Sequence, residues 1–156
     1  MAGLGLAFHG YAKVFRGGGL KGTAGWFSSI GMKPGSVHAA LAAGTEIGAG
    51  LLLAAGLLTP LAGAGYVGLM AVAFWTVHRG KGFLVTKDGW EYNLVLGTIG
   101  VALAGIGPGR ASLDHALGVV DELSGWTGLA TALGLGLLAA VLQLGIFFRP
   151  PPTKST

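Results

Sequence analysis

Apolar residues fall in five long stretches, with few polar positions inside them. The stretches cover about residues 2–15, 37–58, 61–77, 90–106 and 126–148. A membrane-spanning helix needs about 20 apolar residues, with a range of about 17–25, so the first stretch is short and the others suffice. No alternation typical of β-strands occurs. The pattern predicts an all-α fold, a polytopic membrane helix bundle with five spans in one domain, 1–148.

The segments between the stretches carry their own signals. Thr59-Pro60 ends the second stretch, because proline disfavours helix in the residue before it. Residues 112–123 begin with a serine and place apolar residues at helical spacing, which predicts an amphipathic helix on the outer surface. The proline-rich residues 149–156 predict a flexible cytoplasmic tail.

Composition supports a membrane protein. Of 156 residues, 52% are hydrophobic and 10% charged, whereas soluble domains carry about 25% charged residues. The 31 glycines suit close packing between membrane helices. With no cysteine, the chain has no disulfide, thiolate nucleophile or cysteine-ligated metal.

The basic residues predict an orientation. With five spans, nine of the ten Lys and Arg residues fall on one side and only Arg110 on the other. The positive-inside rule places that basic side in the cytoplasm, with the N-terminus outside and the C-terminus inside. The sequence has no arginine-rich patch with interleaved aromatics, the pattern that would indicate nucleic-acid binding. The apolar stretches instead predict the lipid bilayer as a partner.

Glu46 is the main candidate for chemistry. It lies near the middle of the second stretch, where a carboxylate costs roughly 2.5–3.5 kcal/mol on insertion scales and usually faces a partner inside the bundle. Gly44 and Gly48 flank it in a GxxxG arrangement that favours close approach of another helix.

The first stretch offers partners for Glu46. His9 and Lys13 are four residues apart, on one helical face, and His9 lies at a matching depth. We therefore expect a His9–Glu46 contact with Lys13 nearby. Such a pair is consistent with helix packing alone, with a proton relay or ligand pocket, or with a metal site. A metal would need further ligands, so no metal is predicted.

Other polar residues are secondary candidates. Glu91 lies near the start of the fourth stretch. It could cap that helix at the membrane interface, or it could form the cytoplasmic edge of a cavity that contains Glu46. Gln143 predicts an interhelical hydrogen bond. No motif of a hydrolase or nucleotide-binding enzyme occurs, so an enzyme acting alone is not predicted. The remaining candidates are His38 and His78 at the cytoplasmic boundary, and an Arg110–Asp114 pair beside the outer helix.

The order of these residues resembles the DoxX family of small bacterial membrane proteins. The resemblance covers about residues 3–118 and rests on order and spacing rather than on one motif. Its elements are His9-Gly10 with Lys13, Gly22-Thr23-Ala24, Gly31, Pro34-Gly35, TEIGAGLLLAAGLLTPLAG around Glu46, Met70, His78-Arg79, Gly82-Phe83, GWEYNL at 89–94 and GPGRASLD at 107–114.

The resemblance implies a four-helix bundle, with the fifth helix as an addition, in the bacterial plasma membrane. Founding members are associated with thiosulfate:quinone oxidoreductase and relatives with thiol redox systems. It therefore implies a membrane subunit of a redox system, with a redox protein or respiratory complex as partner. A quinone is the cofactor it allows, between walls from Phe74, Trp75 and Tyr92. The alternatives are a non-catalytic scaffold that assembles a larger complex, and a small-solute carrier. A second copy of the chain, in a homo-oligomer, is a further expected partner.

Overall fold

The computed structural model describes residues 1–150, and within them the chain is helical with one isolated β-bridge, between Met32 and Phe148. Three helices are long and apolar enough to cross a membrane: α3, α4 with its π-helical extension, and α8. The all-α membrane fold is confirmed. The elements are α1 (Ala2–Phe15), α2 (Gly19–Ser29), α3 (Gly35–Ala55), α4 (Thr59–Ala73), η1 (Phe74–His78), η2 (Val85–Lys87), α5 (Glu91–Ile106), α6 (Leu113–Ala116), α7 (Val120–Leu123) and α8 (Gly125–Phe147).

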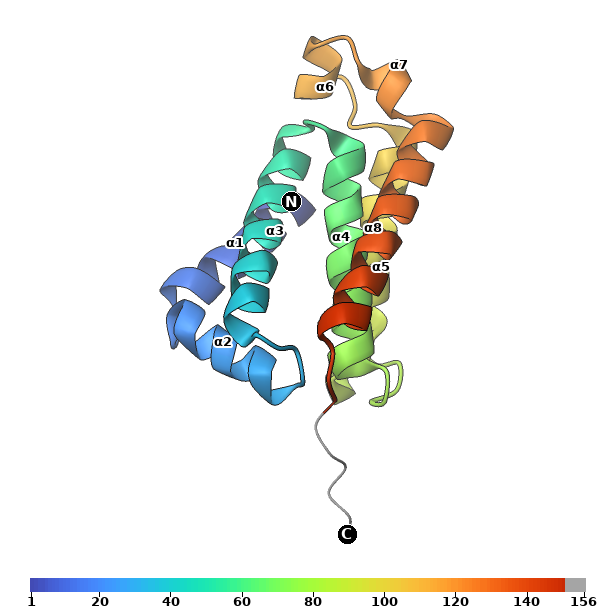
Figure 1. Cartoon of the computed structure of the whole chain (residues 1–156). Coiled ribbons are helices and arrows are strands. Elements are labelled where there is room, and N and C mark those ends of the chain that lie inside the picture. The colour runs from blue at the N-terminus through green and yellow to red at the C-terminus, as the bar shows by residue number, and fades with distance from the viewer. Residues whose placement is uncertain (151–156) are drawn as a thin grey trace.

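The helices form two groups. Helices α1, α2 and α3 form one group, and α4, α5 and α8 form the other, with α6 and α7 above one end (Figure 1). Glycines allow close approach within each group, since a Cβ on Gly50 of α3 would lie 2.6 Å from the carbonyl oxygen of Gly3 in α1. Packing between the groups is sparser, which leaves room for the cavity described below.

One local expectation fails, and a second is tested only at its first residues. The helix predicted over 112–123 is two short helices, α6 and α7, because Gly118 between them has a φ of +73°, a left-handed conformation that interrupts a helix. The predicted flexible tail at 149–156 begins with a paired residue, since the Arg149 N–H donates to Gly31 O at 2.7 Å. Its residues from 151 onward lie outside the described part of the chain.

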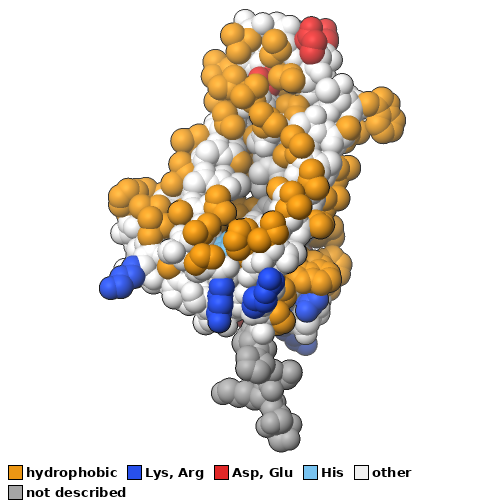
Figure 2. Space-filling view, viewed as in Figure 1, with side chains coloured by type: hydrophobic (Ala, Val, Ile, Leu, Met, Phe, Trp, Pro, Cys, Tyr) orange, Lys and Arg blue, Asp and Glu red, His pale blue; other side chains and the backbone are white. Residues whose placement is uncertain are grey.

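Basic side chains gather at one end of the bundle. Lys and Arg side chains lie at the end formed by α2 and the α4–α5 loop, and the acidic side chains visible in this view lie at the opposite end (Figure 2). Asp88 lies at the basic end, where it pairs with Lys81 at 3.4 Å. Apolar side chains cover most of the surface between these ends. This banding is typical of a protein whose middle lies in lipid.

Candidate functional site

An ion pair joins α1 to α3 inside the bundle. Lys13 Nζ lies 2.6 Å from both Oε1 and Oε2 of Glu46. The Glu46 side chain is 8% exposed and that of Lys13 is 27% exposed. The carboxylate is thus buried, while the lysine reaches it from the edge of the bundle along an apolar stem.

His9 does not take the place predicted for it. The buried residues of α1 are Gly3, Leu6 and Gly10, and Gly10 lies directly against Glu46, since a Cβ there would be 2.9 Å from the Glu46 Cβ. Lys13 extends this face by three residues, whereas His9 is turned about 100° away from Gly10 and is exposed. The expected His9–Glu46 contact is therefore wrong, and Lys13 is the partner.

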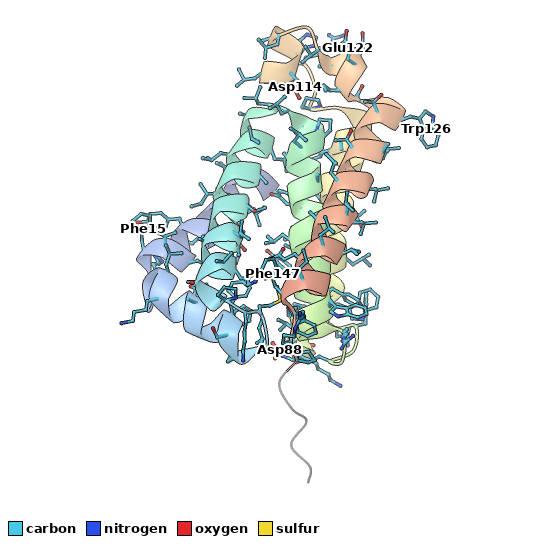
Figure 3. All side chains as sticks on the ribbon, viewed as in Figure 1. Phe15, Asp88, Asp114, Glu122, Trp126 and Phe147 are labelled. Atoms are coloured by element: carbon cyan, nitrogen blue, oxygen red, sulfur yellow. The ribbon has the colours of Figure 1, made fainter. Side chains whose placement is uncertain are left out.

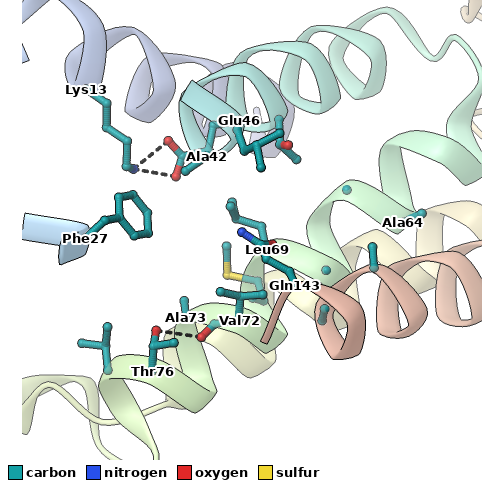
Figure 4. Close-up of a pocket in the computed structure, with 18 of the residues that line it drawn as sticks. Lys13, Phe27, Ala42, Glu46, Ala64, Leu69, Val72, Ala73, Thr76 and Gln143 are labelled. Atoms are coloured by element: carbon teal, nitrogen blue, oxygen red, sulfur yellow. Dashed lines mark hydrogen bonds and ion pairs between the residues drawn. The ribbon is translucent and has the colours of Figure 1, made fainter. Parts of the chain in front are cut away.

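The ion pair forms part of the wall of a cavity of about 420 Å³ between the two helix groups (Figure 4). Most of the wall is apolar. Leu41, Leu61 and Leu135 line it and are also exposed on the surface, so the cavity opens sideways between helices α3, α4 and α8. The polar or aromatic residues that line it are Lys13, Trp26, Phe27, Thr45, Glu46, Thr76 and Gln143.

Gln143 links the helix groups across this cavity. Its Nε2 lies 2.9 Å from Nδ1 of His38, so α8 is joined to α3. The predicted interhelical hydrogen bond of Gln143 is confirmed. His38 was expected at the boundary but is fully buried, with its ring 6.1 Å from that of Phe27 and 5.1 Å from that of Phe147.

Asp114 also differs from expectation. It is fully buried, and Arg110 is exposed. The Asp114 carboxylate accepts the Leu58 N–H at 2.7 Å, the Thr59 N–H at 3.0 Å and the Thr59 hydroxyl at 2.7 Å. It therefore caps the N-terminus of α4 in place of pairing with Arg110, at the opposite end of the molecule from Asp88 (Figure 3).

The remaining candidates lie away from the cavity. Glu91 accepts the Val85 N–H at 3.0 Å and so fastens the α4–α5 loop; it is not part of the cavity wall. His78 bonds through Nδ1 to the Asp88 carbonyl in the same loop. Among the described residues, no group of three or more His, Cys, Asp or Glu is placed to hold a metal ion.

The aromatic walls were assigned to the wrong residues. Trp26 and Phe27 of α2 line the cavity, whereas Trp75 and Tyr92 do not. The sequence indicated only that Trp26 and Phe27 sit among small residues. The α2–α3 loop pairs with the end of α8, and this contact fixes α2 beside the cavity. A contact between such distant segments has no counterpart in the sequence around Trp26 and Phe27.

Comparison with known families bears on the half of the chain that holds the ion pair. The DoxX family model matches residues 1–79, which include α1 through α4 and both members of the pair. The chain belongs to the DoxX family. Helices α5 and α8, and with them Gln143, lie beyond the matched residues. Searches of curated proteins and of solved structures found no match.

Proposed function

We propose that this DoxX protein is a membrane subunit of a redox system and that its central cavity binds a quinone. The observation that carries the proposal is the Lys13–Glu46 ion pair in the wall of an otherwise apolar cavity. A volume of about 420 Å³ lies in the range of small-molecule sites, about 300–1,000 Å³. The sideways opening supports a ligand that arrives from the lipid.

The polar groups suit the two ends of quinone chemistry. A quinone carries only hydrogen-bond acceptors, and its reduction to a quinol takes up two electrons and two protons. The Lys13 ammonium is a donor for a carbonyl oxygen, and Glu46 beside it is a carboxylate that can hold a proton. Phe27 and Trp26 provide aromatic surface for the ring. The electrons would come from a redox partner protein.

Binding in lipid tests the proposal. The full chain in lipid nanodiscs is titrated with a short-chain benzoquinone, and quinone retained after gentle purification is identified by mass spectrometry. Lys13→Met and Glu46→Gln should each weaken binding by about tenfold, the effect of one lost charge-assisted hydrogen bond of roughly 1.5 kcal/mol. Glu91→Gln, outside the cavity wall, is the matched control and should bind as the native chain does.

Two outcomes would contradict the proposal. If the native chain binds no quinone in lipid, or if both cavity variants bind it as tightly as the control, the ion pair serves packing alone. The non-catalytic scaffold would then be the better account of the protein.

We further propose that the end rich in Lys and Arg faces the cytoplasm. The gathering of Lys and Arg side chains at this end supports this (Figure 2), because cytoplasmic segments are enriched in Lys and Arg. A reporter inserted after Leu117 should be active only outside, and one fused to the C-terminus only in the cytoplasm. The reverse pattern would overturn the orientation.

A further inference from the structure

A groove on the surface between α3 and α4 adjoins the central cavity. Its volume is about 400 Å³. The groove and the cavity share four lining residues, Leu41 and Thr45 of α3 and Leu61 and Gly65 of α4. Leu41 and Leu61 are also exposed on the surface. The groove therefore lies where the cavity opens sideways, and a ligand in the cavity can extend into it.

The wall of the groove suits a hydrocarbon chain. It contains no charged residue, and every residue in it other than Thr45 is Gly, Ala or Leu. The wall residues that it does not share with the cavity are Ala40, Gly44, Gly48, Ala49 and Leu52. Such a wall offers packing contacts to an apolar chain and no partner for a charged or strongly polar group.

Two glycines leave the groove open. A Cβ added to Gly44 or to Gly48 would meet no atom of the described residues within 4 Å. The GxxxG arrangement predicted that these glycines would bring another helix close, but α1 approaches a different face of α3, where its Gly10 lies against Glu46. The space beside Gly44 and Gly48 is therefore left for an occupant from outside the described chain.

The direction of the groove matches that of lipid chains. Helices α3 and α4 run side by side along the length of the bundle (Figure 1), and α3 is long and apolar enough to cross a membrane. The twelve residue steps from Ala40 to Leu52 cover about 18 Å at about 1.5 Å a residue. A tail of roughly four isoprene units, each with four bonds of about 1.5 Å along the chain, is long enough to follow the groove.

We propose that this groove holds the isoprenoid tail of a quinone whose head group lies beside Lys13 and Glu46. The inference rests on the proposed function and narrows its ligand to quinones that carry a long hydrocarbon tail. A second copy of the chain is the other occupant that a GxxxG face suits. A helix packed on Gly44 and Gly48 would cover the opening of the cavity, whereas a tail passes through it.

Two quinones with the same head group test the proposal, one without a tail and one with four isoprene units. Each is titrated against the full chain in lipid nanodiscs, and each affinity is expressed relative to the native chain so that partition into lipid cancels. Gly48→Leu should weaken binding of the tailed quinone by about three- to tenfold and leave the tail-free quinone unaffected, because a tail that leaves lipid gains packing contacts rather than hydrophobic free energy.

The variants are chosen to keep the fold. Gly48→Leu should not lower the melting temperature, because the added side chain meets no described atom and glycine is a poor helix former. Gly44→Leu repeats the test one turn away. Gly134→Leu is the matched control: Gly134 of α8 is equally open but lines neither the cavity nor the groove, so both quinones should bind this variant as they bind the native chain.

The outcomes separate this inference from the proposed function. If the native chain binds neither quinone, the proposed function itself fails. If it binds both, but Gly48→Leu and Gly44→Leu bind the tailed quinone as the control does, the tail site is overturned and the proposed function stands. Equal weakening of both quinones would also overturn the tail site, since the groove would then serve the head group.

Native mass spectrometry of the same variants tests the other occupant. The tail site predicts that Gly48→Leu leaves the oligomeric state of the native chain unchanged. If Gly48→Leu separates an oligomer into single chains and leaves binding of the tailed quinone at the native level, the open face belongs to a second copy and the tail site is overturned.

Discussion

Two buried carboxylates in this DoxX protein have opposite surroundings. Asp114 is fully buried and accepts three hydrogen bonds from Leu58 and Thr59, at the start of α4. Glu46 is 6% exposed, and its carboxylate pairs with the side chain of Lys13, at the wall of a cavity. Burial alone therefore does not distinguish a structural carboxylate from one available for chemistry.

The partners make the distinction. The donors to Asp114 include two backbone N–H groups that cannot move without unfolding the first turn of α4, and a carboxylate at a helix N-terminus is also favoured by the helix dipole. The partner of Glu46 is an ammonium on a flexible four-carbon stem. A ligand entering the cavity can compete for that ammonium, whereas nothing comparable can displace the donors to Asp114.

Removing the Asp114 carboxylate should have the largest effect on stability. Asp114→Ala leaves two N–H groups and a hydroxyl without their acceptor in a buried place, and we expect a loss of about 3 kcal/mol in the free energy of unfolding. Denaturant unfolding in detergent measures it. Asp121→Ala, at an exposed position of α7, should change stability by less than about 0.5 kcal/mol. If Asp114→Ala and Asp121→Ala lose the same free energy of unfolding, Asp114 does not have the structural role assigned to it.

Removing the lysine of the ion pair should cause the second-largest loss in the free energy of unfolding. Lys13→Met leaves the Glu46 carboxylate buried without its cation, and we expect a loss of about 2 kcal/mol. The double variant Lys13→Met with Glu46→Leu should recover most of it, because replacing a whole buried ion pair by apolar residues is often neutral or stabilising. Unfolding measurements on all three proteins give the coupling. A double variant no more stable than Lys13→Met would mean that the pair is needed for folding, as Asp114 is.

Breaking the pair from the glutamate side should have a smaller effect. Glu46→Gln keeps a hydrogen-bond acceptor and leaves the charge on Lys13, which is more exposed than Glu46 and can extend toward the interface. We expect a loss of about 1 kcal/mol, with a clear loss of quinone binding. Glu46→Leu, which removes the acceptor as well, should be less stable than Glu46→Gln. A loss for Glu46→Gln as large as that for Lys13→Met would contradict the asymmetry in exposure.

The fold followed from local signals in the sequence, and part of the site did too. Long apolar stretches, Thr59-Pro60 and the charge of Glu46 are local features, and they predicted the helices and the need for a partner. Gln143 was predicted to bond across helices because it is an amide side chain in the middle of an apolar segment. Each of these inferences depends on one residue and its neighbours in the chain.

The failures concern how helices face one another. Asp114 was assigned to nearby Arg110, although its donors lie at Leu58 and Thr59, more than fifty residues earlier. Trp26 and Phe27 were not predicted to line the cavity, although the contact between Gly31 and Arg149 helps to hold α2 beside it. Neither contact leaves a periodic pattern in the sequence, because each joins distant segments through one or two residues.

Substitution of His9 should have the smallest effect, and it tests the choice between His9 and Lys13 as the partner of Glu46. The two residues are four apart on α1, so spacing alone could not separate them. The packed face separates them: Gly3, Leu6 and Gly10 are buried against α3, and Lys13 follows Gly10 by three residues on the same face. His9→Gln should therefore change the free energy of unfolding by less than about 0.5 kcal/mol, and quinone affinity should stay at the native level. A loss of quinone binding in His9→Gln as large as that in Lys13→Met would contradict this choice. It would show that α1 rotates when a ligand binds and turns His9 toward the cavity, so that the surroundings of Glu46, unlike those of Asp114, change with the ligand.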